Sequence, residues 1–158
     1  NLAGNLNPVN YFVEYTVEIF DNSSNSVAQI TDYVYYLGPT GEFSGQIYLP
    51  PDFESGSYIV KVKSPKYLKK QIPGIINIQK NRLTLMPDIS LVAGDMNNDN
   101  ALTLLDYDIL IDCYADLLPA KDCSDEDKKA SADISDDGKV NQDDYNLFLR
   151  ELSILPGD

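Results

Sequence analysis

Aspartates in the second half of this 158-residue chain recur at positions that superpose when the sequence is shifted by 38 residues. The shift places Asp95, Asp99, Asp106 and Tyr107 on Asp133, Asp137, Asp144 and Tyr145. Several side chains of the same chemistry repeated at one offset indicate a duplicated structural unit. Carboxylates gathered in this way would repel one another without a counter-charge, so the chemistry that the repeat predicts is the binding of a hard metal ion.

Each unit supplies oxygen atoms at the spacing of a twelve-residue calcium loop, at positions 1, 3, 5, 7, 9 and 12. The predicted ligands are Asp95, Asn97, Asp99, the carbonyl of Ala101, Thr103 and Asp106 in the first loop, and Asp133, Ser135, Asp137, the carbonyl of Lys139, Asn141 and Asp144 in the second. Position 6 needs a left-handed backbone, which Gly138 adopts freely and Asn100 tolerates. We therefore expect two Ca²⁺ ions. The alternative is that these are acidic surface loops without metal, which requires the ligand spacing to have arisen by chance in both loops.

Both loops depart from a complete EF-hand, in which a helix precedes and a helix follows the calcium loop. Position 12 is Asp rather than Glu, and no helix is expected before the first loop, because residues 83–92 are strand-like and include Pro87. A short helix at most precedes the second loop, over residues 124–130. Opening of the calmodulin type, which moves an entering helix against an exiting one, is therefore not expected. Position 8 is apolar in both loops, as Leu102 and Val140, and is expected in the core.

The first half alternates apolar and polar residues between turns, which is typical of strands with one buried face. Strands are expected at residues 11–20, 29–36, 45–49, 58–63, 75–79 and 82–86. About six short strands predict a small β-sandwich. The chain has eleven tyrosines, most of them in this half; packing with hydroxyls at the rim is the expectation, and a carbohydrate-stacking platform is the alternative.

The pattern changes near residues 87–94, where aspartates become frequent and apolar residues such as Leu105, Ile109 and Cys113 fall at helical spacing. The predicted fold has two domains, an all-β Ig-like sandwich over residues 1–90 and a small all-α calcium-binding domain over residues 91–158. Because no Gly/Ser-rich stretch separates them, the second domain is expected to pack directly on the first.

Composition excludes several functions. A net charge of −13 with 12 Lys and Arg argues against a nucleic-acid partner, and the absence of histidine removes the usual general base and the commonest zinc ligand. No apolar run is long enough for a membrane span. The polar start, residues 1–10, lacks the features of a signal peptide, so any targeting segment is expected to have been removed or to lie outside this sequence.

Cys113 and Cys123 are the only cysteines, and zinc would need more such ligands. A local disulfide is favoured, and two thiols in a reducing compartment are the alternative. A bridge would imply an oxidising, extracellular setting.

Duplicated aspartate-rich loops, each followed by a helical segment, resemble the dockerin family over about residues 94–154. Residues 56–68 resemble a strand and turn of Ig-like and carboxypeptidase-regulatory-like modules, and the two together look like the X-module and dockerin tandem of secreted, cellulosome-type proteins. The resemblance implies a non-catalytic, calcium-dependent module that binds a cohesin domain of a scaffolding or surface protein. It also implies an extracellular location, either secreted or associated with the cell surface.

In the dockerin family, partner choice depends on residues just before position 12 and further along the following helix. The resemblance places these contacts at Leu104, Leu105, Ile111, Asp112, Gln142, Asp143, Leu149 and Arg150. The first repeat has Leu104-Leu105 where the second has Gln142-Asp143. Because the two repeats differ at these contact positions, they are not interchangeable, and one dominant binding mode is expected. Leu105 is expected to pack in the core, whereas Leu104 and Ile111 are better candidates for an exposed apolar contact.

Two other functions stay open. The ions could stiffen a structural module of an extracellular surface protein that has no cohesin partner. An enzyme is the less favoured alternative, because the chain lacks histidine and a reactive-cysteine setting, and its clustered carboxylates are assigned to calcium.

Overall fold

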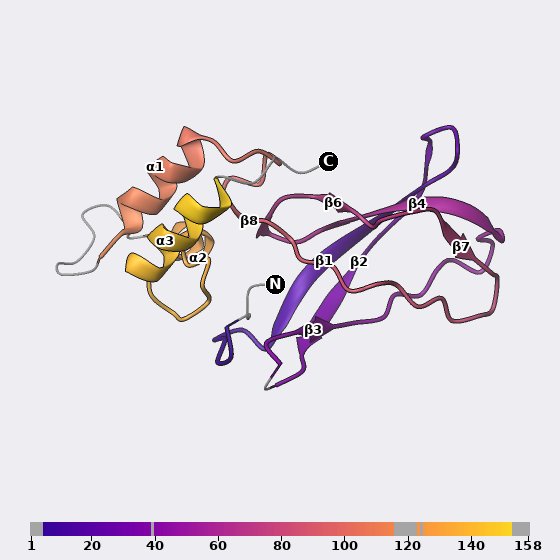
Figure 1. Ribbon diagram of the computed structural model, residues 1–158, viewed down its shortest axis with the longest axis horizontal. Helices are drawn as coiled ribbons and strands as arrows, with labels where there is room; N and C mark the ends of the chain where they lie inside the picture. Colours follow the sequence, from indigo (N-terminus) through magenta and orange to yellow (C-terminus); the bar gives the residue numbers. More distant parts are fainter. Residues whose placement is uncertain (1–4, 39, 116–122, 124, 153–158) are drawn as a thin grey trace.

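The computed structural model describes residues 5–38, 40–115, 123 and 125–152. Strands come first along the chain and helices follow, and the two kinds of element occupy opposite ends of the molecule (Figure 1). The strands are β1 (Phe12–Phe20), β2 (Ser26–Tyr36), β3 (Phe43–Ser44), β4 (Gly56–Lys63), β5 (Lys66–Tyr67), β6 (Lys70–Gln71), β7 (Ile76–Ile78) and β8 (Ala93–Asp95). The helices are α1 (Leu104–Cys113), α2 (Glu126–Ala132) and α3 (Gln142–Glu151). No helix within the described ranges is long and apolar enough to cross a membrane.

The β part is built on one antiparallel sheet with the strand order β3-β2-β1-β4-β6, and β7 also pairs with β4. Val17 of β1 lies opposite Ile30 of β2 and Val62 of β4. Strand alternation turns Tyr15, Val17 and Ile19 to the same buried face. The expected all-β character is confirmed. A two-sheet Ig-like sandwich is not confirmed, because these hydrogen-bonded strands form one curled sheet.

Irregular segments cover the buried face of this sheet. Ile47, Phe53 and Ile89 pack against the core without belonging to a strand. Residues 45–49 and 82–86 form no strand in the structure, so the strands predicted there are wrong. Leu85 explains the second error, since its side chain is 83% exposed and buries too little apolar surface to favour pairing.

The helical part has a core of its own. Its buried residues are Met96, Leu110, Cys113, Ala132, Ile134, Val140 and Phe148. Val140 is buried as expected, and Leu102 packs against the cluster from a half-buried position. The expected core packing of Leu105 is wrong, because its side chain is 60% exposed. In the first turn of α1 the inward position belongs to Asp106, which is fully buried.

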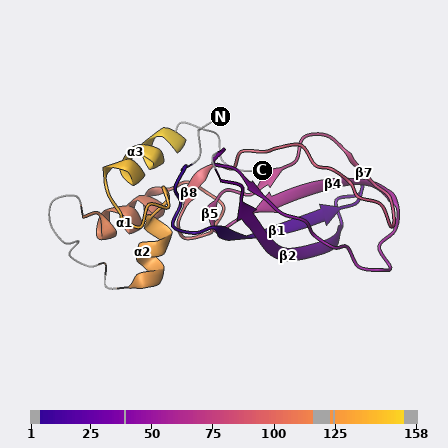
Figure 2. The same cartoon turned by 90° about the horizontal axis from the view of Figure 1, so that it is seen from below.

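Strands β5 and β8 join the two parts directly. They pair antiparallel, with Lys66 opposite Asp95, and the Leu68 N–H donates to the Val92 carbonyl at 2.8 Å. Figures 1 and 2 both show β8 between the helices and the large sheet. The helical part is thus packed on the β part, as the absence of a flexible linker predicted.

Cys113 and Cys123 form a disulfide, with their Cα atoms 4.7 Å apart, which confirms the predicted local bridge. The bridge ties the end of α1 to the segment before α2. We expect the Cys113→Ala/Cys123→Ala variant to lose about 2–3 kcal/mol of unfolding free energy in urea denaturation, because a short covalent loop no longer restricts the unfolded chain. The single variant Cys123→Ala keeps the buried Cys113 side chain, so it separates loss of the bridge from loss of packing. Equal stability of both variants and the unaltered chain would contradict this expectation.

Candidate metal centre and helix faces

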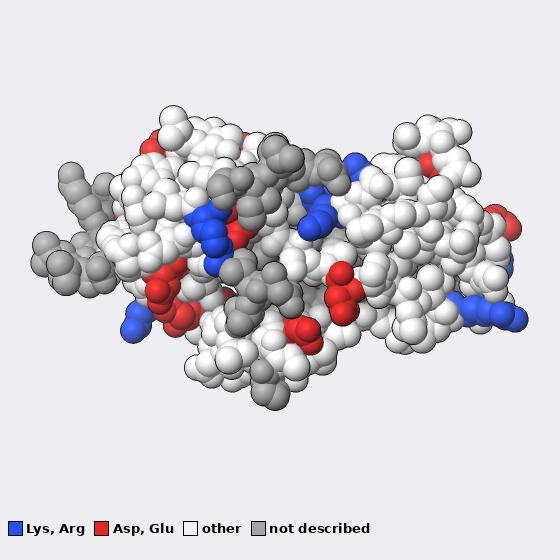
Figure 3. Space-filling view, in the orientation of Figure 1, with Lys and Arg blue, Asp and Glu red and all other residues white. Residues whose placement is uncertain are grey.

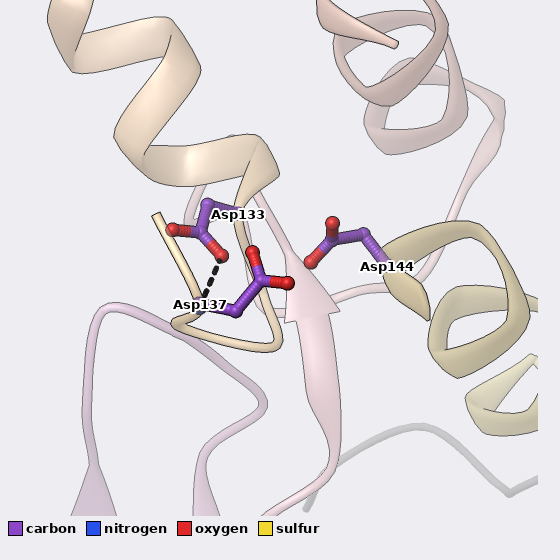
Figure 4. Close-up of side chains that lie close together, drawn as sticks. All are labelled: Asp133, Asp137 and Asp144. Carbon is purple, nitrogen blue, oxygen red and sulfur yellow. Dashed lines mark hydrogen bonds between the residues drawn. The ribbon is translucent and has the colours of Figure 1, made fainter. Parts of the chain in front are cut away.

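The second acidic loop brings three carboxylates together. Asp133 and Asp137 come from the segment after α2, and Asp144 comes from the first turn of α3. Each offers an oxygen atom, and these atoms lie within 4.8 Å of one another. Figure 4 shows the three side chains turned toward a common space. Asp133 and Asp144 are buried, whereas Asp137 is exposed, so the cluster is open to solvent on one side.

Backbone N–H groups hold the first carboxylate of this loop. Asp133 Oδ2 accepts a hydrogen bond from Gly138 N at 2.9 Å, and Asp133 Oδ1 accepts one from Asp137 N at 3.1 Å. The loop turns this tightly because Gly138 has φ +85°, the left-handed conformation predicted at position 6. Asp136 at position 4 is also left-handed, with φ +56°. Its residue type, which tolerates that region, is a signal that the sequence interpretation did not use.

Asp144 closes the loop and starts the helix at the same time. Its Oδ1 accepts from Ser135 N at 2.8 Å, and its Oδ2 accepts from Asn141 N at 2.9 Å. Asn141 in turn caps α3 by accepting from Asp143 N at 2.7 Å. Such a reciprocal capping box satisfies N–H groups that a helix N-terminus leaves unpaired. The geometry of the loop and the position of α3 are therefore set by the same residues.

Burial raises the pKa of both Asp133 and Asp144 above the ordinary aspartate value. Hydrogen bonds from Gly138 N to Asp133 and from Asn141 N to Asp144 counteract part of the rise in each pKa. The negatively charged neighbour Asp144 raises the pKa of Asp133 further. Gathering these charges is costly without a cation, and a divalent ion would offset the cost. The donor set, all oxygen, suits Ca²⁺.

The first loop repeats this backbone arrangement. Asp95 Oδ2 accepts from Asn100 N at 3.1 Å, and Asp106 accepts from Met96 N at 2.8 Å and from Thr103 N at 2.9 Å. Asn100 has φ +67°, again as predicted for position 6. Asp95 is 0% exposed, and its Oδ1 has no hydrogen-bond partner within the described part of the chain. A buried carboxylate oxygen without a donor is suited to a cation.

The first loop differs from the second in the spacing of its carboxylates. Among the described residues, the set Asp133, Asp137 and Asp144 is the only one whose three ligand atoms meet within 4.8 Å. In the first loop, Asp99 is turned to its neighbours, and its oxygens accept from Asn97 Nδ2 at 2.8 Å and from Ala101 N at 2.9 Å.

Side chains at position 9 have a structural role that the sequence interpretation missed. Thr103 Oγ1 accepts from Leu105 N at 3.1 Å and caps α1, as Asn141 caps α3. The signal was present in the sequence, since Thr103-x-x-Asp106 and Asn141-x-x-Asp144 both place a capping residue three positions before a carboxylate.

The β part contacts both loops. Lys63 Nζ donates to Asp95 Oδ2 and to the Tyr67 carbonyl, and Lys66 Nζ donates to the Asp133 carbonyl at 2.7 Å. Lys69 N donates to Asn100 Oδ1 at 2.5 Å. Figure 3 shows acidic and basic side chains close together over the junction of the two parts. These contacts join residues far apart in sequence, and no local pattern predicted them.

The segment before β1 also binds the second loop. Asn10 N donates to Asp136 Oδ2 at 3.0 Å, and Asn10 Nδ2 donates to Asp136 Oδ1 at 2.5 Å. Val9 N and Asn5 Nδ2 donate to the Asp136 carbonyl at 3.0 Å and 2.8 Å. The outer turn of the loop is therefore held from the far end of the chain.

All eight side chains predicted to meet a partner are exposed on α1 and α3. The apolar ones are Leu104, Leu105, Ile111 and Leu149, with Leu104 the most exposed at 78%. The polar ones make local contacts as well. Asp112 forms an ion pair with Lys128, Gln142 Oε1 accepts from the Tyr114 hydroxyl at 3.1 Å, and Arg150 pairs with Glu151 at 2.8 Å.

The family model of the dockerin type I domain matches residues 93–153, which include both loops and all three helices. The part of the chain that follows the large sheet is therefore similar to a dockerin type I domain. The comparison with curated proteins gives no match.

Two solved structures are similar to the chain. One is a type II cohesin–X–dockerin complex from Acetivibrio cellulolyticus mutated at the N-terminal interface; the TM-score is 0.52 and the identity 20%, over 87% of this chain and 79% of that chain. The other is the same kind of complex mutated at the C-terminal interface, with a TM-score of 0.48 and 19% identity over the same shares. At this identity the likeness with the first complex concerns the fold, and it extends over most of both parts of the chain.

Proposed function

We propose that this chain is a non-catalytic docking module, in which calcium orders two helices that bind a cohesin domain. The observation that carries the proposal is the duplicated loop: in both copies a position-12 aspartate accepts N–H groups from the loop and closes the capping box of the following helix. A cation in the loop would fix that aspartate and, through it, the start of the helix. The exposed leucines on α1 would then be presented on a rigid surface.

The proposed metal sites hold one Ca²⁺ ion each, and calcium supplies the positive charge that the clustered carboxylates need. The proposed ligands are the oxygens predicted from the sequence, at Asp95, Asn97, Asp99, Ala101, Thr103 and Asp106 and at Asp133, Ser135, Asp137, Lys139, Asn141 and Asp144. Support comes from the meeting of three carboxylates in the second loop and from Asp95 Oδ1 in the first, which accepts no hydrogen bond from any residue that the structure describes.

The proposed partner is a cohesin domain of a scaffolding or cell-surface protein, in a cellulosome-like complex that serves polysaccharide degradation. Support comes from the dockerin type I match and from the fold shared with a chain of a cohesin–X–dockerin complex. That complex is of type II whereas the family model is of type I, so both types of cohesin belong in the binding assay. The disulfide agrees with a secreted, extracellular protein.

The domain boundary is proposed near residue 90, between an Ig-like, X-module-like domain over residues 1–90 and the calcium-binding domain over residues 91–158. Two separate hydrophobic cores, one on each side of this boundary, support the division.

Calorimetric titration of the metal-stripped chain with Ca²⁺ tests the proposal, with helix content followed by circular dichroism. We expect two bound ions, a gain of helix and calcium-dependent binding of a type I or a type II cohesin. Unfolding free energy should rise by about 4 kcal/mol for each site at calcium a thousandfold above its dissociation constant. Absence of calcium binding would contradict the proposal for the metal sites.

A structural role without a cohesin partner is the second candidate. The observation in its favour is that both loops are already bound by the β part, through Lys63, Lys66 and Asn10. Calcium could then serve to stiffen the junction of the two parts. A chain that binds two ions but neither type of cohesin would favour this function over docking.

A further inference from the structure

An ammonium group lies against the first acidic loop. Lys63, the last residue of β4, donates from Nζ to Asp95 Oδ2 and also to the Tyr67 carbonyl at 2.5 Å. The Lys63 side chain is 18% exposed and that of Asp95 is fully buried, so solvent screens this ion pair little. A buried carboxylate is strongly destabilising unless it is paired, and Lys63 provides the pairing from the β part.

Among the described residues, no ammonium group donates to the equivalent carboxylate of the second loop, Asp133. Asp133 accepts hydrogen bonds from Gly138 N and Asp137 N, which are neutral groups of its own loop. Lys66 does lie nearby, but its Nζ donates to the backbone carbonyl of Asp133 rather than to the carboxylate. Burial raises the pKa of Asp133 and the nearby Lys66 charge lowers it in part, but of the described lysines only Lys63 donates directly to the first carboxylate of its loop.

The Lys63 contact leaves the first loop able to bind metal. Lys63 Nζ and Asn100 N both donate to Oδ2 of Asp95, whereas the buried Oδ1 of the same carboxylate has no hydrogen-bond partner among the described residues. A cation at Oδ1 would share the carboxylate with Lys63 and would be repelled by it. Coulomb repulsion between a divalent ion and an ammonium a few ångströms apart weakens binding even at a high dielectric constant.

We propose that Lys63 is a built-in counter-ion of the first loop, which holds this loop on the β part without metal and weakens its calcium site, so that the second loop fills first. This inference depends on the proposed function, because it assumes that both loops bind calcium. It adds that the two sites are unequal and that a residue of the β part makes them so.

Calorimetric titration of the metal-stripped chain with Ca²⁺ tests this inference, using the variant Lys63→Met. We expect the weaker of the two sites to bind roughly tenfold more tightly in this variant, because the repulsion is removed, with less than a twofold change at the tighter site. In EDTA, amide hydrogen exchange at β8 should be faster in Lys63→Met, since β8 has lost its ion pair with the β part. Lys61→Met is the matched control: it removes the same charge from the same strand, where Lys61 lies over the Phe20 ring.

The order of filling is testable without changing Lys63. Asp99 and Asp137 are exposed residues at position 5 of the two loops, so Asp99→Asn and Asp137→Asn should leave the fold of the metal-free chain unchanged. We expect Asp137→Asn to remove the tighter binding event and Asp99→Asn to remove the weaker one. The reverse assignment, or an unchanged or weaker first site in Lys63→Met, would overturn the inference. If the unaltered chain bound no calcium, the proposed function itself would fail.

Discussion

Replacement of Asp144 by alanine is expected to remove one of the two calcium ions and to destabilise the helical part more than any other single change in the second loop. Asp144 accepts hydrogen bonds from Ser135 N and Asn141 N, and it belongs to the carboxylate cluster. At calcium a thousandfold above the dissociation constant, loss of the site costs about 4 kcal/mol of unfolding free energy. Loss of the capping box adds about 1 kcal/mol.

The measurement is calorimetric titration with Ca²⁺, combined with urea denaturation in calcium and in EDTA. Most of the difference between Asp144→Ala and the unaltered chain should disappear in EDTA, because only the capping contribution persists there. Asp143→Ala is the matched control, since Asp143 is the exposed neighbour in the same helical turn. Two ions bound to Asp144→Ala with unchanged affinity would show that this carboxylate is not a ligand.

Charge placed on the exposed face of α1 is expected to weaken docking strongly without disturbing the metal sites. Leu104 and Ile111 are both exposed, and neither belongs to the hydrophobic core of the helical part. If they are central contacts, Leu104→Asp/Ile111→Asp should weaken cohesin binding by at least about 30-fold, which is the loss of 2 kcal/mol typical of an interface hot spot. Calcium affinity and helix content should stay the same.

Surface plasmon resonance with the cohesin that binds the unaltered chain measures this effect. Leu85→Asp places the same charge at an exposed position of the β part and should leave affinity unchanged. Leu149→Asp on α3 tests the expectation of a single binding mode: a small effect supports docking through α1, whereas an effect as large as that on α1 shows that α3 contributes equally. Unchanged affinity of the α1 variant would remove this face from the interface.

The acidic loops and the helices after them could be predicted from sequence, because their determinants are local. Position 6 needs a residue that tolerates left-handed backbone, and Asn100 and Gly138 are visible as such. Leu105 was assigned to the wrong face because helical spacing alone does not say which face is buried. In the first turn of α1 the buried position belongs to a carboxylate, Asp106, which a pattern of apolar residues cannot indicate.

The architecture of the β part was only partly predictable, because strand pairing depends on residues far apart in sequence. Alternation located β1 and β4, but it also suggested a strand at residues 82–86, which the structure describes as irregular. Strands as short as β5 have no sequence signature of their own. The pairing of Lys63 with Asp95 joins residues 32 positions apart, and no local sequence pattern predicts that these two residues are in contact.

The ladder between β5 and β8 makes the apparent boundary a poor place to divide the chain. Residues 91–158 transplanted alone onto another protein would carry β8 as an edge without its neighbour, and the Asp95 carboxylate would lose the ammonium that balances it. The two parts look separable by sequence pattern, but lysines of the first half bind the acidic loops of the second. Recombination or engineering that exchanges such modules would preserve their properties only by moving both halves together.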